Sequence, residues 1–123
     1  MNTTHGFTLL ELLISIAIIG LLAGVLVPNV LNVREKANVI SADSVGRSVL
    51  SGMAQTEIDG TGAATCTYAG SAVTIVSTPN REVVNAPDPI RDVVCASTPS
   101  SWEVTITYAN RGTQAVKTYI ANK

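Results

Sequence analysis

Hydrophobic residues follow three successive patterns along the chain. Residues 12–33 contain no charged side chain, residues 34–59 have apolar positions every three to five residues, and apolar residues beyond residue 60 alternate with Thr and Ser. These patterns are typical of a continuous apolar helix, an amphipathic helix and β-strands, respectively. The predicted fold is α+β: a long N-terminal helix, half membrane-spanning and half amphipathic, packed on a small antiparallel β-sheet.

The apolar helix is expected over residues 7–33. About 20 helical residues suffice to cross a bilayer, so this segment is long enough to act as a membrane anchor. The end of the run, Val25-Leu26-Val27-Pro28-Asn29, lacks the small residues of a conventional signal-peptidase site. We therefore expect no cleavage after the run.

The amphipathic helix is expected over residues 34–59, with Gly60 ending it. Its predicted buried stripe comprises Val33, Ala37, Ile40, Val45, Val49 and Met53. Residues 60–123 form the predicted surface domain, with one hairpin at 65–69 and 72–78 and a second at 102–108 and 113–120. One sheet built from both hairpins must bury its apolar face on the helix, because so short a segment supports only a small core. Four prolines between the hairpins predict an irregular loop over residues 79–101.

Composition excludes several function classes. Eight Lys and Arg and nine Asp and Glu give a net charge of −1, without the clustered cations that a phosphate-binding face needs. The single histidine is His5, which leaves no His-based catalytic or metal site beyond it. Asp88 and Asp92 are weak candidates for a calcium contact, and ordinary solvated charges are the favoured interpretation. We expect no enzyme and no cofactor.

Two cysteines, Cys66 and Cys95, lie beyond the apolar segment, where an exported domain meets an oxidising compartment. One disulfide is the favoured interpretation, and it would stabilise the domain by about 3 to 4 kcal/mol on the chain-entropy view. Two separate buried thiols are the alternative.

Glu11 stands near the start of the apolar run and requires an explanation. A carboxylate inside a bilayer is costly and usually has a partner or a function. The local alternative is a capping box, in which Thr8 caps the helix and Glu11 reaches back to it. The residues around Glu11 alone leave both interpretations open.

The start of the chain carries a longer motif, which runs Gly6-Phe7-Thr8-Leu9-Leu10-Glu11-Leu12-Leu13-Ile14 and is followed by the apolar run and Pro28. This string resembles the N-terminus of type IV pilins. The resemblance implies that a prepilin peptidase cuts between Gly6 and Phe7, removing a leader of residues 1–6, and methylates the new Phe7 amine. The leader differs from the family pattern because it contains no Lys or Arg, so the positive-inside rule encodes orientation only weakly.

The resemblance also implies roles for residues of the apolar helix. Residues 7–33 would form a filament core, in which Glu11 pairs with the Phe7 amine of a neighbouring subunit. Gly20 and Gly24 would allow close helix packing. Together with Pro28 they would weaken the helix and form a hinge.

By the same resemblance, the expected function is that of a structural subunit of a type IV pilus, a helical homopolymer serving adhesion, twitching motility or DNA uptake. Its partners would be the prepilin peptidase and methyltransferase and the inner-membrane assembly machinery. The precursor would lie in the bacterial inner membrane and the assembled filament at the cell surface. DNA binding would be weak or performed by other subunits. The alternatives are a type II secretion pseudopilin and a non-polymerising, signal-anchored surface-binding module.

Overall fold

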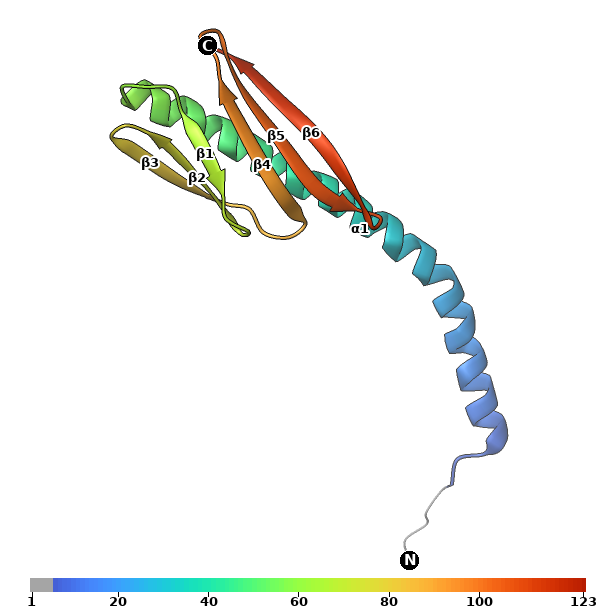
Figure 1. Ribbon diagram of the computed structural model, residues 1–123. Helices are drawn as coiled ribbons and strands as arrows, with labels where there is room; N and C mark the ends of the chain where they lie inside the picture. Colours follow the sequence, from blue (N-terminus) through green and yellow to red (C-terminus); the bar gives the residue numbers. More distant parts are fainter. Residues whose placement is uncertain (1–5) are drawn as a thin grey trace, which may run out of the picture. The chain divides into compact units, whose positions relative to one another are not determined.

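The computed structural model describes residues 6–123 as one long helix followed by six strands (Figure 1). The elements are α1 (Leu9–Asp59), β1 (Thr65–Tyr68), β2 (Ala72–Ser77), β3 (Asn80–Asn85), β4 (Ile90–Ser97), β5 (Ser101–Asn110) and β6 (Thr113–Asn122). The chain divides into two compact units, one ending at Arg34 and the other comprising Glu35–Lys123. The predicted α+β fold is confirmed.

Helix α1 ends at Asp59, one residue before Gly60, as predicted. Its buried residues are Ala42, Val45, Gly46, Val49, Gly52, Met53 and Thr56. The predicted stripe was wrong at Ile40, which is 66% exposed, and at Val33 and Ala37, which are also exposed. The buried stripe differs from the predicted one because it includes glycines. At Gly46 and Gly52 the helix backbone packs directly against the side chains of Tyr119 and Ile75.

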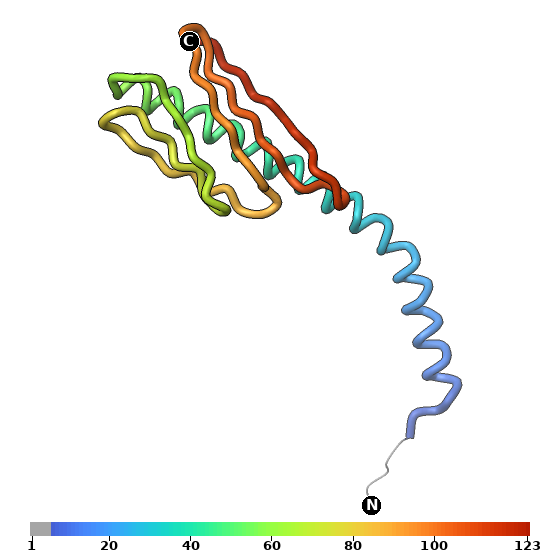
Figure 2. The backbone as a smooth tube through the Cα atoms, in the orientation of Figure 1, coloured from blue at the N-terminus to red at the C-terminus, as the bar shows by residue number. Residues whose placement is uncertain are grey.

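The six strands form two three-stranded antiparallel sheets, β1-β2-β3 and β4-β5-β6, rather than the single predicted sheet. Within each sheet, consecutive strands pair as hairpins. Strands β1 and β4 lie next to each other but belong to different sheets, with no hydrogen-bonded ladder between them. The path of the backbone through both strands is drawn in Figure 2. The Cys66–Cys95 disulfide joins these two strands, which confirms the predicted pairing.

The predicted irregular loop over residues 79–101 was also wrong, because this stretch contains β3 and β4. Its prolines lie outside the strands: Pro79 between β2 and β3, Pro87 and Pro89 between β3 and β4, and Pro99 between β4 and β5. Proline cannot donate to a ladder, so prolines delimit strands as well as loops. In this stretch they mark the ends of strands.

The core lies between α1 and the inner faces of both sheets. In β5, Trp102, Val104, Ile106 and Tyr108 are buried and alternate with more exposed residues, as the sequence pattern predicted. From the helix, Val49 and Met53 are fully buried, as are Val73 and Ile75 from the first sheet. The sheets therefore bury their apolar faces on the amphipathic half of α1.

Candidate functional site

The apolar half of α1 exposes all its large side chains. Between Phe7, at 81% exposed, and Val33, at 60%, each large aliphatic side chain is more than half exposed. This part of the helix is long and apolar enough to cross a membrane. A contiguous apolar surface of this size requires a cover of lipid or protein.

Glu11 forms a capping box with Thr8 in the single chain. The Thr8 backbone N–H and hydroxyl donate to Glu11 Oε2 over 3.3 and 3.1 Å, and the Glu11 N–H lies 3.3 Å from Thr8 Oγ1. These contacts satisfy donors at the start of α1 that have no intrahelical acceptor. The local interpretation of Glu11 is therefore observed, and its carboxylate lies at the exposed beginning of the helix.

The predicted processing site lies immediately before α1. Gly6 and Phe7 are exposed and non-helical, and a Cβ at Gly6 would meet no heavy atom within 4 Å. The peptide bond between them is thus accessible within the described chain. The rest of the predicted leader, including His5, lies outside the described residues.

Gly20 and Gly24, two of the predicted assembly residues, lie on a different side of the helix from Glu11. Gly20 follows Glu11 by about two and a half turns, which places it on the opposite side, and Gly24 lies one turn further on the same side as Gly20. Neither glycine has a heavy atom within 4 Å of the place where a Cβ would be. Pro28 lies within α1, and because it has no N–H it cannot donate to the Gly24 carbonyl.

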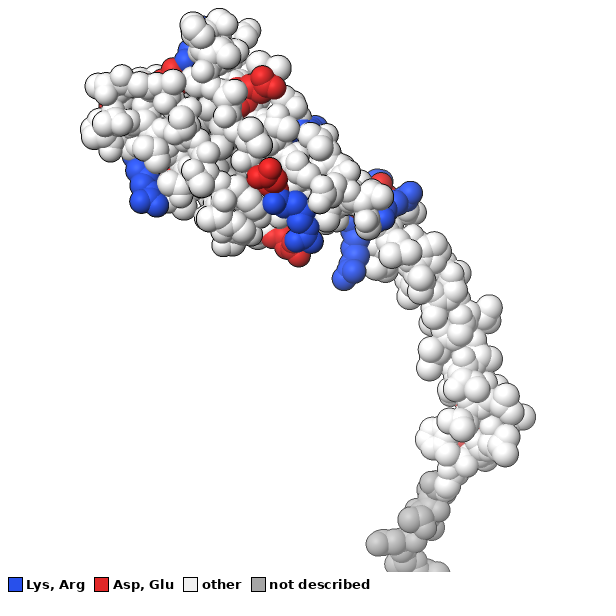
Figure 3. Space-filling model, viewed as in Figure 1, with Lys and Arg blue, Asp and Glu red and all other residues white. Residues whose placement is uncertain are grey.

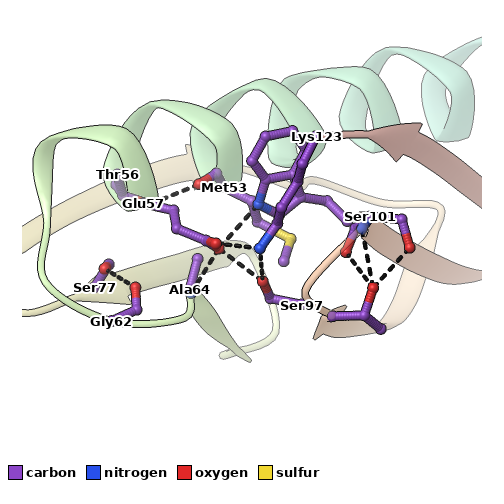
Figure 4. A network of polar contacts seen from close by, with 11 residues as sticks. Met53, Thr56, Glu57, Gly62, Ala64, Ser77, Ser97, Ser101 and Lys123 are labelled. Atoms are coloured by element: carbon purple, nitrogen blue, oxygen red, sulfur yellow. Dashed lines mark hydrogen bonds and ion pairs between the residues drawn. The ribbon is translucent and has the colours of Figure 1, made fainter.

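Glu57, near the end of α1, anchors the helix to four other segments (Figure 4). Its Oε2 accepts hydrogen bonds from Trp102 Nε1 at 2.9 Å, Ser97 Oγ at 2.7 Å and the Ala64 N–H at 3.2 Å, and its Oε1 pairs with Lys123 Nζ. The bond from Lys123, followed by that from Ser97, lowers the pKa of Glu57 to about 2. A carboxylate with this many donors is held ionised and in place.

Asp43 forms a second anchor in the middle of the folded unit. Its Oδ1 accepts from Lys117 Nζ at 2.5 Å and from the Tyr119 hydroxyl at 2.6 Å. The hydrogen bond from Lys117, followed by that from Tyr119, lowers the pKa of Asp43. Burial, followed by the hydrogen bond to Asp43, raises the pKa of Tyr119. The Tyr119 ring reaches this position because it lies against Gly46, where any Cβ would collide with it.

A third anchor holds the β5–β6 turn. Arg111 Nε lies 2.7 Å from Glu35 Oε2, and the Asn38 amide donates to the Ala109 carbonyl over 3.1 Å. Arg111 and Gly112 adopt positive φ values of 48° and 76°, as a tight two-residue hairpin turn requires. The three anchors fix the amphipathic part of α1 to the sheet β4-β5-β6, and sequence reasoning found none of them because their partners are far apart in the chain.

The weak calcium candidates do not gather into a cage. Asp88 pairs with Arg91 at 3.0 Å, and Asp92 Oδ1 accepts the Val93 N–H at 2.9 Å. Among residues 6–123, no group of three or more His, Cys, Asp and Glu side chains could hold a metal ion. Lys, Arg, Asp and Glu are scattered singly or as mixed pairs over the face in Figure 3, without a continuous basic area in that view.

Taken together, the structure has an exposed apolar helix, capped by Thr8 and Glu11, and a small disulfide-bonded unit fixed to the second half of that helix. Such an arrangement is consistent with a protein whose exposed apolar helix is covered by lipid or by other helices.

Comparison with known proteins agrees with this class. Residues 1–27 match the family described as "Prokaryotic N-terminal methylation motif". The chain is also 60% identical over 38 residues to the type IV wide pilus major component PilA4 of Thermus thermophilus, and the aligned part spans 31% of this chain and 29% of that relative. No solved structure matches the chain. The chain therefore has an N-terminal methylation motif at the start of an α+β fold, and the relative that it resembles over this part is a pilus component.

Proposed function

We propose that the chain is a structural subunit of a type IV pilus, which polymerises through α1 into an extracellular filament. The observation that carries this proposal is the exposed apolar half of α1, which bears the N-terminal methylation motif and is continuous with a helix anchored to the sheets. Lipid covers this surface before assembly, and the helices of other copies cover it afterwards. The same surface thus serves as membrane anchor and as filament core.

Processing at the Gly6–Phe7 bond converts the precursor into the subunit. A prepilin peptidase removes residues 1–6 and methylates the Phe7 amine. The exposed, non-helical backbone before α1 supports this proposal, because a protease needs an extended and accessible chain. Cleavage there leaves the apolar helix attached to the surface unit.

Assembly gives Glu11 a second partner. Among residues 6–123 its carboxylate accepts hydrogen bonds only from Thr8, and it is exposed, so it is available for the Phe7 amine of a neighbour. In a medium of low dielectric constant an ion pair is strongly favoured over two isolated charges. Pairing therefore fixes the axial register of an incoming helix, while Gly20 and Gly24, on the opposite side, allow another helix to approach closely.

The surface unit faces outward in the filament and determines what it contacts. Adhesion, twitching motility and DNA uptake are the activities that such a filament serves, with the inner-membrane assembly machinery as its partner. Scattered, mixed charges support weak DNA binding by this subunit itself (Figure 3). The precursor resides in the inner membrane and the polymer at the cell surface.

The deciding experiment is intact mass with N-terminal fragmentation on protein from its native cells, with sheared surface fibres separated from membranes. A chain that begins at methylated Phe7 and is abundant in the fibres supports the proposal. An unprocessed chain confined to membranes indicates a simple anchored module instead. A processed chain that never leaves the membrane, in cells that secrete proteins through it, favours a pseudopilin.

A further inference from the structure

Strand β6 forms an open edge of the sheet β4-β5-β6. Within residues 6–123 only β5 pairs with it, and it lies at the margin of this sheet in Figure 1. The two-residue turn at Arg111 and Gly112 makes Asn110 and Thr113 a hydrogen-bonded pair, and such pairs alternate along an antiparallel ladder. The residues of β6 whose N–H and C=O groups point away from β5 are therefore Gln114, Val116, Thr118, Ile120 and Asn122.

This edge has little of the protection that is usual for an edge strand. Protection normally comes from a short strand, a proline, a β-bulge or an uncompensated charge. Strand β6 has ten residues without proline, and its pairing with β5 shows no register shift. Its one charged residue, Lys117, is paired with Asp43 of α1. The edge strand β3 of the other sheet, by contrast, has six residues and carries both Arg81 and Glu82.

The side chains of β6 are self-complementary about Thr118. When two such strands run antiparallel with Thr118 opposite Thr118, residues of the same kind face each other: Val116 and Ile120, Ala115 and Ala121, and Gln114 and Asn122. Lys117 then faces Tyr119, so the two ammonium groups are not opposite each other. The backbone groups that point away from β5 in one strand also meet those of the other.

Other registers of the same strand match less well. Centring the pair on Lys117 places the two Lys117 ammonium groups opposite each other, which is destabilising. Centring it on Tyr119 places Ile120 opposite Thr118 and Ala121 opposite Lys117, so that apolar residues face polar ones. The side-chain pattern therefore specifies the register with Thr118 at the centre.

Pairing in this register also covers apolar side chains that the single chain leaves in water. Val116 is 63% exposed and Ile120 is 64% exposed, and both lie on the outer face of the sheet with Thr118 between them. In the paired strands, Val116 of each copy lies beside Ile120 of the other. A Thr–Thr pair at the centre stabilises such a ladder, as the 3.2 Å contact between the Thr105 and Thr118 hydroxyls does within one chain.

We propose that two copies of the chain pair through the edges of β6, antiparallel and with Thr118 at the two-fold axis, so that their two three-stranded sheets become one continuous sheet. The contact is isologous, so it closes as a dimer and does not itself build a polymer. The two-fold axis reverses the direction of the second folded unit, whereas all subunits of one polar filament point the same way. On the proposed filament function, the contact therefore joins subunits of two neighbouring filaments that run in opposite directions.

Cysteine cross-linking tests the register in the full chain purified in detergent. The described residues contain no free cysteine, so introduced thiols are the only reactive ones there. Facing residues of a hydrogen-bonded pair have Cα atoms about 5.5 Å apart, which a disulfide can span, so Thr118→Cys should form covalent dimers on its own. Val116→Cys and Ile120→Cys should each stay monomeric when oxidised alone, because equivalent residues are about 13 Å apart, and should form heterodimers when mixed.

A matched control separates the edge from the rest of the outer face. Thr105→Cys introduces the same change on the same face, one strand further from the edge, and should stay monomeric on oxidation. A mixture of Val116→Cys and Ile120→Cys that gives no heterodimer, or equal cross-linking of either variant alone, would overturn the proposed register.

Charge at the two-fold axis tests the strength of the contact. Thr118→Lys places like charges opposite each other, which should raise the dissociation constant of the detergent-solubilised dimer by about tenfold or more. Thr67→Lys makes the same change at an exposed position in β1 and should leave the dissociation constant unchanged. Sedimentation measures both, and equal melting temperatures show that both variants fold. Equal dissociation constants for the two variants would overturn the contact, and if Thr118→Lys does not fold, the mixed-cysteine experiment decides.

Electron microscopy of sheared fibres separates this contact from the filament function. Fibres of the unaltered chain should associate side by side, whereas Thr118→Lys should give single fibres in the same total yield. Dimers in detergent without any fibres would overturn the filament function and support the contact. Fibres from a chain that gives no cross-linked dimers would support the filament function and overturn the contact.

Discussion

The ring of Tyr119 in β6 occupies the space where a side chain at Gly46 of α1 would be. Gly46→Ala should therefore displace the ring and weaken the hydrogen bond from the Tyr119 hydroxyl to Asp43. We expect a loss of about 1 to 3 kcal/mol of unfolding free energy, as is usual for overpacking a core. Thermal unfolding of the full chain in detergent measures it, with Gly62→Ala as control because a Cβ at Gly62 meets nothing within 4 Å. Equal melting temperatures for the two variants would show that the ring has room to move.

Glu57 should make the folded unit sensitive to acid. The pKa of Glu57 is lowered from 4.5 to about 2, so its ionised form stabilises the folded state fully above about pH 4.5. That contribution is lost progressively as the pH falls from 4.5 towards 2. Glu57→Gln should cost about 1 to 3 kcal/mol at pH 7, and the difference from the unaltered chain should shrink across this pH window. Unfolding measured at several pH values checks the slope. Glu103→Gln, on the opposite face of β5 from Trp102, is the control. If the loss of unfolding free energy caused by Glu57→Gln is constant from pH 7 to pH 2, the electrostatic cause is contradicted.

The disulfide should stabilise the junction between the sheets. Replacing Cys66 and Cys95 together by Ser opens a crosslink between residues 29 positions apart, which we expect to cost about 3 to 4 kcal/mol. Hydrogen exchange should then increase first in β1 and β4, because no backbone ladder joins these neighbouring strands. Protection that falls uniformly over both sheets would mean that the sheets separate only on global unfolding.

Capping and assembly by Glu11 can be separated with two variants. Thr8→Ala removes the cap but keeps the carboxylate, whereas Glu11→Gln removes the charge and keeps a side chain able to accept a hydrogen bond from Thr8. If Glu11 pairs with the Phe7 amine of a neighbour, fibre yield should fall at least tenfold in Glu11→Gln and much less in Thr8→Ala. Sheared fibres and processed subunit retained in membranes are measured side by side. Equal losses in both variants would assign Glu11 a capping role alone.

Features with local signals could be predicted from the sequence. The helix end before Gly60 and the alternation from Trp102 to Tyr108 depend on residues close in the chain, and the structure confirms both. The Cys66–Cys95 pair was found because only two cysteines are present.

Features without a local signal were missed. Strands β3 and β4 were hidden by prolines that lie between strands, and the division into two sheets leaves no local mark on β1 or β4. The anchoring roles of Asp43 and Glu57 depend on Lys117 and Lys123, which lie 74 and 66 residues away along the chain. The sequence signal for these anchors is an acidic residue next to the buried stripe of an amphipathic helix. This signal does not identify the residue with which the acid pairs.

The three anchors along α1 also determine how the subunit bears force. Glu35, Asp43 and Glu57 span about 33 Å of the helix. They pair with Arg111 in the β5–β6 turn, Lys117 in β6 and Lys123 after β6, respectively. Tension transmitted along the helix axis loads these contacts together in shear, so no single contact carries it alone. A pull perpendicular to the axis opens them one after another. The folded unit should therefore resist tension along the axis of the amphipathic part of α1 better than a pull across it.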